Sequence, residues 1–115
     1  MTDEDCIFCK INAGDIPSEK LFEDDDCFAI RDIAPKAPTH LLVIPKEHFT
    51  YLTGMTAGFQ PVIGSMYNAA RQLAISEGVA EPGYRLIVNQ RDDSGQEVPH
   101  LHMHLLGGRK LGPMG

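Results

Sequence analysis

The stretch His100-Leu101-His102-Met103-His104-Leu105-Leu106 carries a histidine at every second position. Side chains of an extended strand alternate between its two faces. We therefore expect the three imidazoles on one face and the apolar side chains on the other, packed against a core. Imidazole titrates near neutral pH and can act as base, acid, nucleophile or metal ligand. The pattern predicts a half-buried strand that presents a chemical site, against the plainer alternative of a strand that is merely rich in histidine.

The spacing of these histidines limits what they could bind together. Alternate residues of a strand lie roughly 6–7 Å apart, and the outer pair roughly 13 Å. Zinc–nitrogen bonds are only about 2 Å long, so a single metal ion shared by all three imidazoles is disfavoured. A row of imidazoles suits an extended polar substrate. Phosphate is the natural one, because imidazole nitrogen forms a labile bond to phosphorus.

Two glycine-containing loops flank the histidine stretch. Residues 94–98 precede it as Ser-Gly-Gln-Glu-Val, and Gly107-Gly108-Arg109 follows it. The first loop can present backbone amides to an anion, and the glycines of the second permit a sharp turn or a close backbone approach. Each loop alone is as well explained by a structural turn. Beside the histidines, both favour a phosphate site.

Length and charge exclude several classes of protein. The 115 residues, 43% of them hydrophobic, are enough for one domain, 1–115, with a core of its own. Ten basic residues against 16 acidic ones give a net charge of -6. A nucleic-acid polymer needs clustered Lys and Arg, so we do not expect one as a partner. A small nucleotide held by amides and imidazoles remains compatible with this charge.

Neither export nor membrane insertion is expected from the sequence. Residues 1–5, Met-Thr-Asp-Glu-Asp, are acidic where a signal peptide would be basic. The aliphatic run Leu41-Leu42-Val43-Ile44 is far too short to cross a bilayer. We expect a cytoplasmic protein without a membrane partner. In that setting the pair in Cys6-Ile7-Phe8-Cys9 favours a metal or redox site over a disulfide.

Hydrophobic periodicity and turn residues predict an α+β domain with helices on an antiparallel sheet. Asp24-Asp25-Asp26 is the expected turn of a hairpin, and residues 32–38 are a proline-rich loop. The expected helices are 6–13 and Pro61–Ser76, and the expected strands are Lys20–Glu23, Cys27–Ile30, His40–Pro45, Tyr84–Asn89 and Leu101–Leu106.

The histidine stretch resembles the His-φ-His-φ-His-φ-φ signature of the histidine triad (HIT) superfamily, in which φ is an apolar residue. Residues 28–35, 37–46, 83–89 and 107–109 extend the resemblance over nearly the whole chain. It is most similar to the bacterial type of the histidine triad nucleotide-binding (Hint) branch. The resemblance implies a HIT-like fold of about five antiparallel strands with two helices, paired as a homodimer with a continuous sheet.

The resemblance also implies a function. Hint-like proteins are purine nucleotide-binding hydrolases that cleave the P–N bond of nucleoside phosphoramidates and release a nucleoside monophosphate. His102 would be the nucleophile that forms a nucleotidyl-histidine intermediate, and His104 would contact the phosphate or ribose. His100 and His40 would support them. Two alternatives stay open: a nucleotide-binding regulatory module with weak turnover, and a dinucleoside polyphosphate hydrolase or nucleotidyl transferase.

Further residues would bind the nucleotide by the same resemblance. Asp32 matches the carboxylate that accepts hydrogen bonds from the ribose hydroxyls, although it could equally cap a turn. Glu97 stands where many relatives carry serine, and a carboxylate there repels phosphate unless it is protonated. The residues expected around the base are Ile33, Ile7, Phe8 and Ile16, and those expected around the phosphate are Asn89, Gln96, Glu97 and Val98.

A second site follows from the cysteine pair. In some HIT proteins such a pair binds a structural zinc ion together with two histidines, which here would be His48 and His100 beside Cys6 and Cys9. Two thiolates and two imidazoles suit tetrahedral zinc. The alternative is two small buried thiols near the first helix, with His48 on the surface. No organic cofactor is expected.

Overall fold

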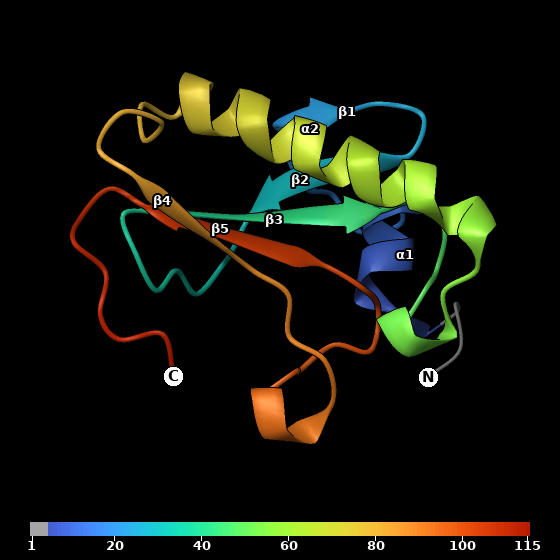
Figure 1. Ribbon diagram of the computed structural model, residues 1–115. Helices are drawn as coiled ribbons and strands as arrows, with labels where there is room; N and C mark the ends of the chain where they lie inside the picture. The colour runs from blue at the N-terminus through green and yellow to red at the C-terminus, as the bar shows by residue number, and fades with distance from the viewer. Residues whose placement is uncertain (1–4) are drawn as a thin grey trace.

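The computed structural model describes residues 5–115. Its central element is a five-stranded antiparallel sheet (Figure 1). The strand order is β1-β2-β3-β5-β4, so β3 lies at the centre, β2 and β5 flank it, and β1 and β4 are the edges. The strands are β1 (Phe22–Glu23), β2 (Cys27–Arg31), β3 (Thr39–Pro45), β4 (Tyr84–Ile87) and β5 (Met103–Gly107). The predicted α+β class and antiparallel sheet are confirmed. The predicted domain, 1–115, also includes residues 1–4, which lie outside the described residues.

Helix α2 (Gln60–Ser76) covers one face of the sheet. Pro61 lies in its first turn, where the missing N–H costs nothing. The buried side chains of α2 recur at helical spacing, and they pack on β-strand residues such as Leu41, Val43 and Leu105 in the larger core. The buried residues of the helix are Met66, Ala69, Ala70, Leu73 and Ala74.

Helix α1 (Ile7–Ala13) lies on the opposite face (Figure 1). Its buried residues, Phe8 and Ile11, join a second apolar cluster with Phe28, Ile30 and Leu42 of β2 and β3. Because both faces of these two strands are covered, they are apolar runs without polar alternation. The predicted helix started one residue earlier; Cys6 is instead the extended residue that precedes α1.

The histidine strand is shorter than predicted. β5 begins at Met103, two residues after the expected start, because the preceding backbone bonds elsewhere: the Leu101 N–H donates to Phe49 O at 2.6 Å. β4 ends at Ile87, two residues before the predicted end, and its last pair in the ladder is Ile87 with His104. Side chains nevertheless alternate as expected. Leu101, Met103 and Leu105 are buried in the larger core beneath α2.

The turn after β5 depends on two glycines. A Cβ on Gly107 would lie 3.0 Å from the Val79 side chain. Gly108 has φ +94°, and a Cβ there would lie 2.9 Å from Pro38. Both a left-handed backbone and a close approach therefore require glycine, as the sequence indicated.

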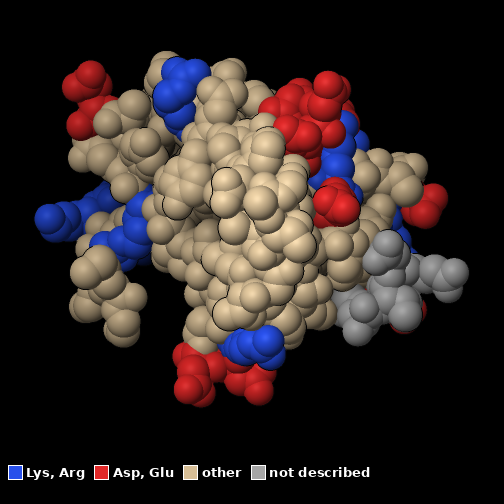
Figure 2. Space-filling model, turned by 45° about the vertical axis from the view of Figure 1, so that its right-hand side comes forward, with Lys and Arg blue, Asp and Glu red and all other residues tan. Residues whose placement is uncertain are grey.

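Figure 2 shows how the charged side chains lie on one face of the molecule. On that face, small groups of charged side chains, some with acidic and basic members side by side, surround an uncharged centre. This distribution gives no continuous basic stripe on that face of the kind that follows a nucleic-acid backbone. Among residues 5–115, no helix combines the length and apolar character needed to cross a bilayer.

Candidate active site and metal cluster

A cavity of about 470 Å³ opens on the α1 side of the sheet. This volume lies in the range of pockets that bind small molecules, roughly 300–1,000 Å³. It brings together residues that are far apart in the sequence and that come from α1, the loop after β2, β3, the loop before residue 98, and β5. The predicted site residues that line it are Ile7, Phe8, Asp32, Ile33, His40, Asn89, Glu97, Val98, His102 and His104.

Three predicted residues are not among those that line the cavity. Ile16 packs against the apolar cluster under α1. The Gln96 side chain accepts a hydrogen bond from the Arg91 N–H at 2.7 Å and donates one to Val98 O at 3.2 Å, so it braces its own loop. His100 is fully buried and turns toward the cysteines.

The cavity also has lining residues that the sequence did not single out. Ile30 and Leu42 form part of its apolar wall, and Lys36 lies at its mouth with Ile33, which is 98% exposed. Nothing in the apolar runs of β2 and β3 distinguishes the face toward the cavity from the face toward α2. The helix that packs against each set of alternate residues decides this, and the strand sequences do not state it.

His102 has one ring nitrogen committed to the backbone. Its Nδ1–H donates to the main-chain carbonyl oxygen of His100 at 2.7 Å. A carbonyl can only accept, so Nδ1 carries the proton and Nε2 keeps a lone pair. Burial lowers the pKa of His102, partly opposed by that backbone bond. The ring is therefore neutral near pH 7, with a nucleophilic nitrogen in the cavity wall.

A chain of hydrogen bonds orients the neighbouring histidine. The Lys36 N–H donates to His40 Nδ1 at 3.0 Å, which leaves the proton of neutral His40 on Nε2. That Nε2–H donates to His104 Nδ1 at 2.9 Å, with Asp32 Oδ2 3.5 Å from the same nitrogen. His104 therefore carries its own proton on Nε2. The site thus holds a fixed hydrogen-bond donor, His104 Nε2–H, beside the acceptor nitrogen of His102.

Burial keeps these rings uncharged. It lowers the pKa of His104 to about 4, helped by repulsion from His102 and His40. It also lowers the pKa of His40, which the Asp32 carboxylate partly opposes. Asp32 itself accepts a bond from the Ala34 N–H at 2.8 Å, so it caps the turn after β2 while facing the cavity. The turn cap is therefore compatible with a place in the cavity lining, and ribose binding by Asp32 stays a prediction.

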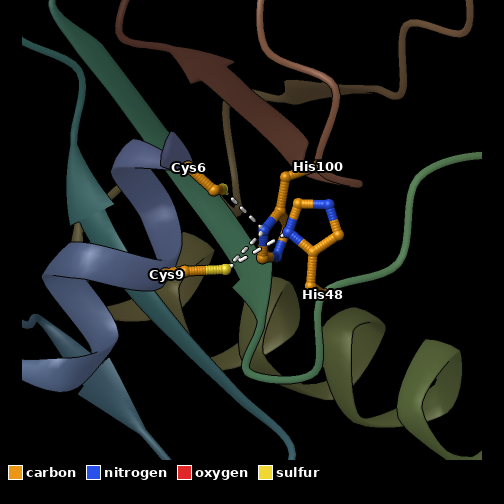
Figure 3. A group of neighbouring side chains, drawn as sticks. All are labelled: Cys6, Cys9, His48 and His100. Atoms are coloured by element: carbon orange, nitrogen blue, oxygen red, sulfur yellow. Dashed lines mark hydrogen bonds between the residues drawn. The ribbon is translucent and has the colours of Figure 1, made fainter. Parts of the chain in front are cut away.

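Four side chains form a separate cluster beside the cavity (Figure 3). The Sγ atoms of Cys6 and Cys9 lie 3.2 and 3.6 Å from His100 Nδ1, and Cys9 Sγ lies 3.2 Å from His48 Nδ1. Tetrahedral zinc with its usual bond lengths separates sulfur and nitrogen ligands by about 3.5 Å. The His100 Nε2–H donates to Pro45 O at 2.9 Å, which leaves the Nδ1 lone pair toward the thiols. The four residues therefore fit a zinc ion.

Asp32, His40 and His104 form another close group, with ligand atoms within 4.8 Å of one another. Hydrogen bonding separates the two groups. His40 accepts at Nδ1 and so holds its proton on Nε2, the atom that would have to bind the metal. His100 is bonded the opposite way round: its Nε2–H donates to Pro45 O, and its acceptor Nδ1 faces the thiols of Cys6 and Cys9. The cluster of Cys6, Cys9, His48 and His100 is therefore suited to a metal ion. The group of Asp32, His40 and His104 is suited to fixing the orientation of its imidazoles.

This chain is similar to known proteins along most of its length. The HIT domain family matches residues 13–111. The purine nucleoside phosphoramidase of Escherichia coli (strain K12) is 49% identical over 111 residues, which cover 96% of this chain and 93% of that protein. A HIT family hydrolase from Legionella pneumophila Philadelphia 1 superposes with a TM-score of 0.90 at 45% identity, covering 94% of this chain and 96% of that one.

A zinc-bound relative is also similar. The Zn-bound histidine triad family protein from Mycobacterium smegmatis superposes with a TM-score of 0.81 at 30% identity, over 94% of this chain and 78% of that one. The family match spans most of the chain, and the alternating histidines 100–104 lie within it. The chain belongs to the HIT domain family.

Proposed function

We propose that the protein is a purine nucleoside phosphoramidase that hydrolyses the P–N bond through a covalent intermediate on His102. The observation that carries the proposal is the bond from His102 Nδ1–H to His100 O, because it leaves Nε2 as an unprotonated nucleophile in a cavity of nucleotide size. The similarity to the purine nucleoside phosphoramidase of Escherichia coli supports the substrate class.

In the first step His102 Nε2 attacks the α-phosphorus. The P–Nε2 bond forms as the bond to the bridging nitrogen breaks, and that nitrogen keeps the electron pair, takes a proton from water and leaves as an amine. His104 Nε2–H is the neutral donor for a phosphoryl oxygen. Because the pKa of His104 is about 4, it stays a hydrogen-bond donor and does not become charged at neutral pH.

In the second step water attacks phosphorus and gives one proton to the hydroxide left by the first step. The P–Nε2 bond breaks, its electron pair returns to Nε2, and a nucleoside monophosphate is released. Splitting one difficult displacement into two easier ones is the gain of covalent catalysis. Asp32 would accept the ribose hydroxyls with its Oδ2, and Ile7, Phe8 and Ile33 would contact the base. The high exposure of Ile33 at the cavity mouth supports this, since an apolar side chain gains from a ring placed against it.

We assign a structural zinc ion to Cys6, Cys9, His48 and His100. The ion would bind α1 to the loop after β3 and to the residue before Leu101. It would supply only the tetrahedral anchor, with all four positions filled by protein ligands, as in other structural sites. Each side chain already lies within 4.8 Å of the other three at its ligand atom.

We also propose that two chains pair through β4. This strand is an edge of the sheet, and its outer backbone groups are available for a second copy. Tyr84 at its start is 40% exposed, which adds apolar surface at the same edge. Antiparallel pairing of two β4 strands would continue the sheet across a dimer. Light scattering after size exclusion tests this, and a monomeric mass at micromolar concentration contradicts it.

The enzymatic proposal is tested with adenosine 5′-phosphoramidate. Wild-type protein should release AMP, and His102→Ala should be slower by at least about 10³-fold while still binding AMP by calorimetry. Mass spectrometry of a rapid quench should detect a nucleotidyl adduct on His102. Equal turnover by both proteins contradicts the covalent mechanism. Faster turnover of a dinucleoside polyphosphate would favour the alternative hydrolase, and AMP binding without turnover would favour a regulatory module.

A further inference from the structure

We propose that metal binding at the cluster of Cys6, Cys9, His48 and His100 and nucleotide binding in the cavity are thermodynamically linked, through Phe8 and the main-chain carbonyl of His100. The proposal rests on the proposed function, because it requires a nucleotide in one site and a metal in the other. What the proposal adds is that bound metal raises the affinity of the protein for nucleotide, and bound nucleotide raises its affinity for metal. Linkage requires both effects to be equal.

One short helix serves both sites. α1 places Cys9 in the cluster and the next residue back, Phe8, in the cavity wall. It has only seven residues and no side-chain cap at its N-terminus. A helix of that length is not stable by itself, so its position depends on what holds it to the sheet. Fixing Cys9 to a metal therefore also fixes Phe8 against the nucleotide site.

The Phe8 ring is in contact with both histidines. Its centroid lies 5.6 Å from that of His100, with an interplanar angle of 85°, and 5.1 Å from that of His102, with an angle of 66°. Both are edge-to-face contacts of the favourable kind. Phe8 is only 5% exposed, so it cannot move without moving its neighbours. It is a packed wedge between a metal ligand and the proposed nucleophile.

His100 provides a second connection through its own backbone. Its ring belongs to the metal cluster, while its carbonyl oxygen accepts a hydrogen bond from His102 Nδ1–H at 2.7 Å. The residue is fully buried and its Nε2–H is fixed to Pro45 O at 2.9 Å. A displacement of the ring after metal loss therefore displaces the carbonyl that sets which nitrogen of His102 is free.

The coupling is measured with zinc and AMP. We expect zinc-loaded protein to bind AMP at least about five-fold more tightly than protein freed of metal by chelator, the lower end of typical coupling between sites. Zinc affinity, measured by competition with a chelating dye, should rise by the same factor when AMP saturates the cavity. Calorimetry and the dye give these values without any turnover.

Two variants of α1 separate coupling from binding. Phe8→Leu keeps an apolar residue but removes the ring contacts with His100 and His102, so the coupling factor should fall toward one while zinc still binds. Ile7→Ala is the matched control. Ile7 lines the same cavity from the same helix without a ring contact to either histidine, so AMP affinity should fall with the coupling factor kept.

The outcomes distinguish this proposal from the proposed function. Equal AMP affinity with and without zinc overturns the linkage and leaves both sites standing. Failure to bind zinc overturns the linkage and the zinc assignment but not the hydrolase. Failure to bind AMP overturns both proposals. If metal-free protein loses its fold by circular dichroism, cobalt(II)-loaded protein gives the second measurement: AMP should shift its visible bands in wild type and not in Phe8→Leu, and an unchanged wild-type spectrum overturns the linkage.

Discussion

His102 donates its Nδ1 proton to the carbonyl oxygen of His100, 2.7 Å away and two residues earlier in the chain. This single bond distinguishes His102 from the other buried histidines. His100 donates through Nε2 to Pro45 O, and His40 accepts at Nδ1 from the Lys36 N–H. Of His40, His100, His102 and His104, only His102 is therefore held with its proton on Nδ1, at the position where a nucleophile needs a free Nε2.

The tautomers can be measured directly. In long-range ¹H–¹⁵N correlation spectra near pH 7.5, His102 should carry its proton on Nδ1, whereas His40 and His104 should carry theirs on Nε2. The reason is that each ring has one nitrogen committed to a fixed donor or acceptor. A His102→Gln spectrum assigns the signal. A His102 proton on Nε2 would contradict the proposed nucleophile.

Acid should destabilise the protein through His104. Its pKa is about 4 in the folded state and near 6.5 when unfolded. Between these values only the unfolded chain binds the proton, so the free energy of unfolding falls as pH decreases from about 6.5 to 4 and is unaffected by this group above 6.5. The loss is at most about 3 kcal/mol. Urea denaturation across this range measures it. His104→Gln should show a shallower slope, and an unchanged slope would contradict the assignment.

Zinc should bind at one equivalent per chain. Cys9→Ala should abolish stoichiometric binding, because it removes one of four ligands, and should lower the melting temperature of zinc-loaded protein to that of chelated wild type. Cys27→Ala is the control: Cys27 is equally a small thiol but lies in the larger core under α2. Metal analysis by mass spectrometry decides. Equal zinc content in the two variants would exclude the cluster.

The Arg91→Gly variant should be more stable than the Arg91→Ala variant. Its φ of 67° and ψ of -174° lie in a region that only glycine occupies readily, and its guanidinium lies 3.9 Å above the Tyr51 ring. Both variants lose that ring contact, but only glycine relieves the backbone, so Arg91→Gly should exceed Arg91→Ala by about 1 kcal/mol in the free energy of unfolding. At exposed Arg71 in α2, the order should reverse by about the same amount. The same order at both positions would contradict the strain.

Gly108→Ala should cost at least about 1–2 kcal/mol in the free energy of unfolding. The new Cβ meets Pro38 at 2.9 Å, and φ is +94°. Gly112→Ala is the matched control, since a Cβ there has open space and the backbone is not left-handed. Chemical denaturation of the two variants gives the comparison. A cost at Gly112 as large as that at Gly108 would contradict the close approach.

Patterns of side chains predicted most of the fold. Alternation correctly assigned Leu101, Met103 and Leu105 to the core, and helical periodicity found α2 to within a residue. The wrongly predicted start of the histidine strand is explained by a backbone hydrogen bond. The start of β5 moved because the Leu101 N–H bonds to Phe49 O, a partner that no local pattern indicates.

Strand alternation alone does not separate the three histidines of the stretch; only the resemblance to the HIT superfamily gave them different roles. The sequence places His100, His102 and His104 on one face, and the structure turns the first toward the cysteines and the other two toward the cavity. That division depends on which face of β3 α1 covers. Gln96 illustrates the opposite case, because its amide is consumed by its own loop. Such local competition for a polar group has no signature in composition or spacing.

The carbonyls of His100 and Pro45 and the amide of Lys36 have a shared consequence for how this site could change over time. All three are main-chain atoms, so no replacement of a side chain deletes them, except proline at position 36, which has no amide N–H. Alanine scanning would pass over these positions as partners of the imidazoles. Drift in the surrounding sequence can reshape the cavity and alter what it accepts, yet the protonation pattern is inherited by every descendant that keeps the path of the backbone.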